Sequence, residues 1–319
     1  MFPLSFCTFG NDTGFPVFGL LLRISGIARL GRLFLGWGAA TVLVSACSGD
    51  LWLGEPNVFP DDILLKKGFE KTWLEAGQFD ILAFVKNGPN PGPMVVYIEG
   101  DGRAWRSKNR LSSDPTPYNP VGAKLAALDG HVSVVWLARP CQYSKGSPHW
   151  RTCRPAYWSL ERLSEAVVED TNRAIDALLR KTRRSGLHLV GFSGGGGLAA
   201  LIAARRDDVL SLRTVAGTLD TKIFTDHHNV TPLYGSLNPV EVAFRLRALP
   251  QTHYVGADDD IVPFSVAQNW RQRARNADCL TVRLMEGVSH GAGWEAVWTQ
   301  EGKVIPGCPE VGGQGKVAR

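Results

Sequence analysis

The chain has 319 residues, of which 44% are hydrophobic and 20% are charged, and its formal net charge is +5. This size allows one large domain or two small ones, and the composition is that of an ordinary globular protein with a sizeable core. The mild positive charge, without a dense patch of basic and aromatic residues, argues against nucleic acid as a partner. The cysteines lack the C-x-x-C spacing of a zinc site.

The N-terminal segment has the order of a secretory signal. Arginines at positions 23, 29 and 32 precede an apolar run of small residues at 33–46. This run is shorter than the roughly 20 residues that a membrane-spanning helix needs. It ends in Leu43-Val-Ser-Ala-Cys47, which resembles the bacterial lipobox, so we expect cleavage before Cys47 and lipid on its thiol. The alternative is an ordinary signal peptide whose cleavage site lies near a cysteine.

The expected mature protein begins at Cys47, which divides the chain into a signal peptide at 1–46 and one domain at 47–319. Ser48 follows the lipidated cysteine, as in lipoproteins that Gram-negative bacteria sort to the outer membrane. The resemblance therefore implies a membrane partner reached through the lipid anchor. In a Gram-negative cell, the location would be the periplasmic face of the outer membrane.

Four cysteines remain once Cys7 leaves with the leader and Cys47 carries lipid. An even number in an oxidising compartment predicts disulfides. We expect the pairs Cys141–Cys153 and Cys279–Cys308, because each closes a short local loop. Free buried thiols are the alternative.

The elements alternate between strands and helices along the mature chain. Apolar runs predict strands at 79–86, 94–99, 132–138, 187–191, 213–217, 252–256 and 280–285. Apolar spacing predicts helices at 160–183, 194–206, 240–249 and 264–277, the first capped by Ser159. This alternation indicates one doubly wound α/β domain with a mostly parallel sheet. The segments 103–120 and 221–239 are predicted to be long polar loops.

The sharpest motif is Gly191-Phe-Ser193-Gly-Gly195, a G-x-S-x-G between a predicted strand and a helix of small residues. This context predicts a nucleophile elbow, a tight turn in which side chains at 191 and 195 would collide with neighbouring backbone. Ser193 then projects from the carboxyl end of its strand. A glycine-rich phosphate loop is the alternative, but the G-K-[ST] ending of a P-loop is missing.

A nucleophilic serine needs a base and an orienting acid, and candidates for both follow it in the chain. The predicted strand at 252–256 ends in an acidic turn with Asp258, Asp259 and Asp260, and His290 precedes a glycine-rich helix start. Both lie at the carboxyl ends of strands, where an open α/β sheet gathers its site. The competing histidines, which lack this setting, are His188, His227, His228 and His253.

The sequence resembles the α/β-hydrolase superfamily in the order and spacing of three motifs. These are the elbow, the G-x-x-D-x-x-V-P turn at 256–263 and the Ser-His-Gly motif at 289–291. The match spans most of the mature chain. More narrowly, the stretches at 98–105, 137–143 and 235–239 resemble a group of proteobacterial hydrolase lipoproteins. The superfamily resemblance implies an α/β-hydrolase fold.

The resemblance also assigns roles to residues. Asp259 would be the acid, with Asp258 and Asp260 as the alternatives, and His290 would be the base. The backbone N–H groups of Gly194 and Asp101 would form the oxyanion hole. The superfamily often has His-Gly in this loop, whereas this chain has Glu99-Gly100, and Glu99 would be either a hydrogen-bonded support or a structural residue.

The implied activity is cleavage of a carboxylic ester, or a related acyl bond, through an acyl-serine. The substrate would be a small-molecule or lipid-like acyl compound, and no metal or organic cofactor is implied. The segment 221–239 would be a short lid. A basic loop with Trp105 either receives an anionic group or is merely solvated; its charged residues are Arg103, Arg106, Lys108 and Arg110. The competing class is an inactive lipoprotein of the same fold that serves as an envelope-binding or structural module.

Overall fold

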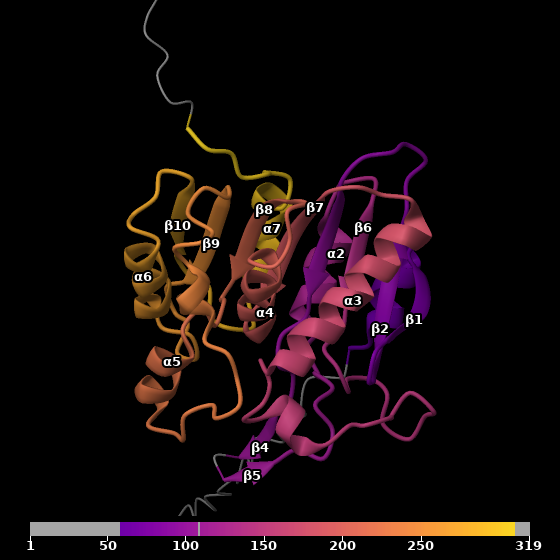
Figure 1. Ribbon diagram of the computed structural model, residues 1–319, viewed down its shortest axis with the longest axis horizontal. Coiled ribbons are helices and arrows are strands. Elements are labelled where there is room, and N and C mark those ends of the chain that lie inside the picture. The colour runs from indigo at the N-terminus through magenta and orange to yellow at the C-terminus, as the bar shows by residue number, and fades with distance from the viewer. Residues whose placement is uncertain (1–57, 108, 310–319) are drawn as a thin grey trace, which may run out of the picture. The chain divides into compact units, whose positions relative to one another are not determined.

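The computed structural model describes residues 58–107 and 109–309, so the expected signal peptide and Cys47 lie outside the described residues. The described chain is built on an eight-stranded sheet with the order β1-β2-β6-β3-β7-β8-β9-β10 (Figure 1). The strands are β1 (Glu70–Ala76), β2 (Phe79–Lys86), β3 (Met94–Ile98), β6 (Val134–Leu137), β7 (Leu187–Phe192), β8 (Val209–Val215), β9 (Gln251–Gly256) and β10 (Leu280–Met285). β2 runs antiparallel to both neighbours, and all the other neighbouring pairs are parallel.

Helices cover both faces of the sheet, as the doubly wound prediction requires. Figure 1 shows α3, α4 and α6 in front of the sheet and α2 and α7 behind it. Their bounds are α1 (Pro60–Leu64), α2 (Val121–Leu128), α3 (Glu165–Thr182), α4 (Gly194–Ala203), α6 (Phe264–Arg273) and α7 (Trp294–Glu301). Consecutive strand residues point to opposite faces, so Val95 packs in the core under α2 and α7, and Val96 packs in the core under α3 and α4. The predicted fold class is confirmed.

Two strands of the eight-stranded sheet differ from the prediction by more than two residues. β1 was not predicted: it is an edge strand, paired only with β2, and its exposed polar residues hide the apolar pattern. β8 runs from Val209 to Val215 rather than over 213–217, so Arg213, which was predicted as the first residue of the strand, lies inside it. Its guanidinium is fully buried and donates from Nη1 to the carbonyl oxygens of Gly302 at 2.9 Å and Val304 at 3.2 Å.

Two helix predictions were wrong in start or type, and α4 and α6 end three and four residues earlier than predicted. The helix predicted to start at residue 160 starts at Glu165, and Ser159 does not cap it: its hydroxyl donates to the Pro155 carbonyl at 2.7 Å, beside the 3-10 helix η2 (Pro155–Trp158). The helix predicted over 240–249 is the short 3-10 helix η3 (Pro239–Val242) followed by turns. Its segment is confined between two prolines, Pro239 and Pro250, and closes mostly with bonds to the third residue back.

The two predicted loops also contain regular structure. Helix α5 (Thr221–His228) begins the segment 221–239, because the Asp220 carboxylate caps it by accepting from the amides of Lys222 at 2.9 Å and Ile223 at 3.2 Å. The segment 103–120 contains a small hairpin of β4 (Trp105–Ser107) and β5 (Arg110–Leu111). The remaining short element is the 3-10 helix η1 (Leu65–Lys67).

The four described cysteines form the two predicted pairs, Cys141–Cys153 and Cys279–Cys308. Disulfides persist in oxidising compartments, so this pairing indicates an exported protein. Among the residues that the structure describes, no helix is both long and apolar enough to cross a bilayer.

Candidate active site

Ser193 lies in a strained turn between β7 and α4. Its backbone has φ +51° and ψ −122°, a conformation that residues with a side chain rarely adopt. A Cβ on Gly191 would lie 2.2 Å from the Gly195 carbonyl oxygen, and one on Gly195 would lie 2.4 Å from the Glu99 carbonyl oxygen. The predicted reason for both glycines therefore holds: neighbouring backbone occupies the space of their side chains.

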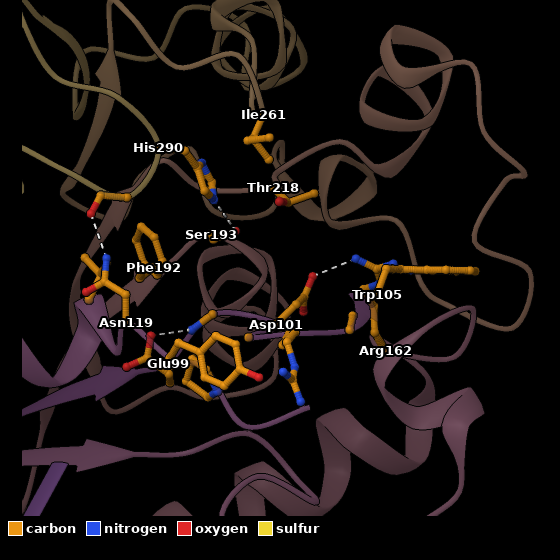
Figure 2. Close-up of a pocket in the computed structure, with 18 of the residues that line it drawn as sticks. Glu99, Asp101, Trp105, Asn119, Arg162, Phe192, Ser193, Thr218, Ile261 and His290 are labelled. Atoms are coloured by element: carbon orange, nitrogen blue, oxygen red, sulfur yellow. Dashed lines mark hydrogen bonds and ion pairs between the residues drawn. The ribbon is translucent and has the colours of Figure 1, made fainter. Parts of the chain in front are cut away.

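The structure brings Ser193, His290 and Asp259 together from three separate loops. His290 Nε2 lies 3.0 Å from Ser193 Oγ, as Figure 2 shows, and His290 Nδ1 lies 3.0 Å from Asp259 Oδ2. The Asp259 side chain is fully buried, and its Oδ1 accepts from the amides of Ile261 at 2.9 Å and Val262 at 2.8 Å. These bonds fix the carboxylate against the imidazole.

The alternative acids and bases lie elsewhere. Asp258 and Asp260 are both exposed on the same turn. Burial lowers the pKa of His188 to about 4 and that of His253 to about 3, and both rings bond within the sheet, to Ser211 and Thr214 respectively. The remaining two candidates, His227 and His228, sit on α5, where His228 donates to the Ile261 carbonyl at 2.7 Å.

The two expected oxyanion donors have free amides. Gly194 is the first residue of α4, where a helix leaves its N–H groups without intrahelical acceptors. Asp101 follows β3 in the loop that faces the elbow, and it lines the same cavity as Ser193. Neither amide donates to another residue within the described part of the chain. Both are therefore available to a ligand.

The Asp101 side chain forms a buried cluster that the sequence did not reveal. Its carboxylate accepts from Arg139 Nη1 and from Arg162 Nη1, each at 2.8 Å (Figure 2 draws the Arg162 bond). Burial alone would raise the pKa of Asp101, but the charges of Arg162 and Arg139 outweigh it and hold the pKa below its usual range. The carboxylate lies against Gly194, because a Cβ there would be 2.1 Å from Asp101 Oδ1.

Glu99 supports the loop that carries Asp101. Its buried carboxylate accepts from the amides of Gly100 at 3.0 Å, Gly122 at 3.2 Å and Ala123 at 3.1 Å, and from Trp136 Nε1 at 2.9 Å. Burial still raises its pKa. The bonds join β3, the start of α2 and β6 beneath the site, so Glu99 is the hydrogen-bonded support that one of the two expectations described.

A cavity of about 520 Å³ opens beside Ser193 and His290. Its apolar lining includes Trp105 from β4, Phe192 from β7 and Phe224 from α5. α5 is thus part of the cavity wall at the position of the predicted lid. One residue of the expected basic loop, Arg103, lines the cavity together with the neighbouring Trp105. Arg106 and Arg110 do not line it, and Lys108 lies outside the described residues. No group of three or more His, Cys, Asp or Glu within 58–107 and 109–309 is arranged to hold a metal ion.

Asn119 is a cavity residue that sequence reasoning missed. Its Nδ2 donates to the Gly291 carbonyl at 2.9 Å (Figure 2), which ties the segment before α2 to the loop that carries His290. The Trp294 indole bonds the same loop by donating to the His290 carbonyl at 2.9 Å. No local motif marks a contact between residues so distant in sequence.

Replacement of Asn119 by alanine is expected to lower kcat for ester cleavage on the order of tenfold, because the loop that carries His290 loses its tie to the segment before α2. The measurement is steady-state kinetics with a p-nitrophenyl ester, together with the melting temperature. The control is Asn109→Ala, because Asn109 is exposed in the turn between β4 and β5. This variant should have the kcat and the melting temperature of the native protein. An unchanged kcat in Asn119→Ala would show that the tie does not position His290.

Comparison with known proteins gives one relative in sequence and many in structure. No family model matches the chain. Polyketide synthase GfsE from Streptomyces halstedii is 26% identical over 204 residues, which cover 59% of this chain and 5% of that protein. This chain therefore spans a small part of the curated relative that it matches.

Several of the solved structures that resemble this chain are named as peptidases or hydrolases. A puromycin-hydrolyzing peptidase from Mycobacterium tuberculosis superposes with a TM-score of 0.54 at 18% identity, over 73% of this chain and 37% of that one. Est1E from Butyrivibrio proteoclasticus superposes with a TM-score of 0.52 at 12% identity, over 73% of this chain and 96% of that one. An acylaminoacyl peptidase from Pyrococcus horikoshii superposes with a TM-score of 0.50 at 12% identity, over 72% of this chain and 39% of that one. Together with the sheet order, these likenesses show that the chain has the α/β-hydrolase fold.

Proposed function

We propose that this protein is a serine hydrolase that cleaves a carboxylic ester, or a related acyl bond, through an acyl-serine intermediate. The observation that carries the proposal is the line of contacts from Ser193 Oγ through His290 to the buried Asp259, with both distances at 3.0 Å. A nucleophile within reach of a base, and a base held by an acid, is the arrangement that acyl transfer requires. The names of two structural relatives, a puromycin-hydrolyzing peptidase and an acylaminoacyl peptidase, also support acyl-bond cleavage.

The proposed reaction has two halves. Ser193 Oγ attacks the acyl carbon while His290 Nε2 takes its proton, and the tetrahedral intermediate then collapses and expels the alcohol, which receives that proton. Water next gives a proton to His290 and attacks the acyl-serine, which releases a carboxylic acid and returns the proton to Ser193. Throughout, Asp259 accepts from His290 Nδ1–H, which leaves Nε2 unprotonated to act as the base.

The oxyanion of each intermediate would be stabilised by the amides of Gly194 and Asp101. A lone carboxylate beside this position would oppose the developing negative charge. The carboxylate of Asp101 does not act alone, because Arg139 and Arg162 both pair with it and the cluster carries a net positive charge. The two arginines also fix the side chain of Asp101, and with it the direction of the loop.

We further propose that the domain at 47–319 is anchored to a membrane by lipid on Cys47, after removal of a signal peptide at 1–46. The lipobox-like residues that end in Cys47 and the two disulfides support this proposal. In a Gram-negative cell, Ser48 favours the periplasmic face of the outer membrane. The substrate would be a small-molecule or lipid-like acyl compound that reaches the cavity from this compartment.

The proposal is tested by the turnover of p-nitrophenyl esters of increasing acyl length by the purified protein. We expect turnover above the background reaction, with an initial burst of nitrophenolate if the acyl-serine accumulates. Absence of turnover across esters, thioesters and amides would contradict the proposal and favour an inactive envelope-binding protein of the same fold.

A further inference from the structure

Two arginines line the cavity together with Ser193 and His290. In the proposed reaction, neither guanidinium group contacts the substrate. The first is Arg103, whose guanidinium carbon lies 4.2 Å from the centre of the Tyr118 ring. Its Nε is buried and has no hydrogen-bond partner in the described chain. No described carboxylate lies within ion-pair distance of this side chain. Within the described residues, Arg103 is thus a cation held by stacking and without a counter-charge.

The second arginine, Arg162, is fixed in place but keeps a free donor. Nη1 donates to Asp101 and Nε donates to the Ser159 carbonyl, both at 2.8 Å. Nη2 has no hydrogen-bond partner among the described residues, and the side chain is only 10% exposed. Because Arg139 shares the Asp101 carboxylate, one negative charge faces two guanidinium groups. Arg162 therefore offers an only partly compensated charge to the cavity.

The carboxylates of the site have their own partners already. Glu99 accepts four hydrogen bonds below the cavity floor, and Asp259 accepts from two backbone amides and from His290. Among the described residues, the charged groups on the cavity wall that keep unpaired atoms are consequently the guanidinium groups of Arg103 and Arg162. One uncharged acceptor, Asn119 Oδ1, is also unpaired there. A desolvated guanidinium binds carboxylates strongly because its planar donors match two carboxylate oxygens.

We propose that the substrate carries an anionic group of the carboxylate type, which Arg103 and Arg162 bind while Ser193 attacks its acyl carbon. This inference rests on the proposed hydrolase function and names its substrate class. The apolar walls formed by Trp105, Phe192 and Phe224 accommodate the carbon chain that separates the two ends. A monoester of a short dicarboxylic acid has this form, as does an ester whose alcohol carries the carboxylate.

The first test compares two pairs of chromogenic esters on the full-length protein. The first pair is mono-p-nitrophenyl adipate and its methyl-capped twin, which place the charge on the acyl side. The second pair is a butyrate ester of a nitrophenol with or without a ring carboxylate, which places the charge on the leaving group. We expect kcat/KM to favour the charged member of one pair on the order of ten- to a hundredfold, and the pair that shows it identifies the side.

Arg103→Gln should reduce this preference about tenfold or more, and Arg103→Lys should restore part of it, because charge returns without the bidentate donors. Arg106→Gln is the matched control: it removes the same charge three positions along, outside the cavity, and should keep the preference. Turnover of both pairs without a preference for charge, or a preference that survives in Arg103→Gln, overturns the inference and leaves the hydrolase function intact.

A binding measurement separates the inference from catalysis. Calorimetric titration of the Ser193→Ala variant with adipate should show binding that Arg103→Gln weakens about tenfold or more, and adipamide should not bind. This result would support the anion site even if no ester were turned over. Equal binding of adipate and adipamide, or no binding of either, would overturn it even if esters were cleaved.

Discussion

His290→Ala is expected to lower kcat for ester cleavage by about 10⁶-fold, the order seen when a triad loses its base. The imidazole lies 3.0 Å from Ser193 Oγ, and no other described side chain that could accept the proton contacts that oxygen. The variant loses both the acceptor of the serine proton and the donor to the leaving group. The measurement is kcat on the ester that the native protein cleaves best.

The control for this variant is His227→Ala, which removes a histidine from α5 without touching the proposed triad. It should retain native kcat. The melting temperature of His290→Ala checks that the fold persists. If His290→Ala kept more than a hundredth of the native rate, a different base would have to be sought.

Asp259→Asn is expected to lower kcat by about 10⁴-fold with little change in the fold. The carboxylate accepts from His290 Nδ1 at 3.0 Å and from the amides of Ile261 and Val262. An asparagine oxygen can keep the backbone bonds, but its NH₂ group then faces Nδ1 and favours the wrong tautomer. The imidazole would present N–H to the serine and could not take its proton.

The neighbouring aspartates supply matched controls, because Asp258→Asn and Asp260→Asn remove the same charge from the same turn. Both side chains are exposed, and neither contacts His290. Each variant should keep at least half of the native kcat. A larger loss in either one than in Asp259→Asn would move the role of the acid to that position.

The sequence predicted those parts of the fold that depend on local pattern. β2 begins and ends where predicted, because its apolar run bounded by turn residues reports burial directly. β10 also has the predicted bounds, although only Leu280 of this strand is buried. The elbow was predictable for a similar reason. Backbone contacts at Gly191 and Gly195 tolerate no side chain, so the motif itself records the packing.

The remainder depended on distant neighbours. Arg213 was predicted as the first residue of its strand, whereas the strand begins at Val209 and the partners that allow this charge inside it lie after α7. The Asp220 cap of α5 appeared in sequence as one more polar residue of a loop. Likewise, Asp101 was expected to act only through its amide, whereas its carboxylate is bound by Arg139 and Arg162 from later segments. No spacing rule links such partners.

Labelling of the purified protein with a fluorophosphonate probe shows whether Ser193 is an activated nucleophile. We expect stoichiometric labelling of the native protein at Ser193 and none of Ser193→Ala at equal fold stability. Labelling of both proteins would place the reactive group elsewhere. Failure of the folded native protein to react would contradict the claim that His290 and Asp259 activate this serine.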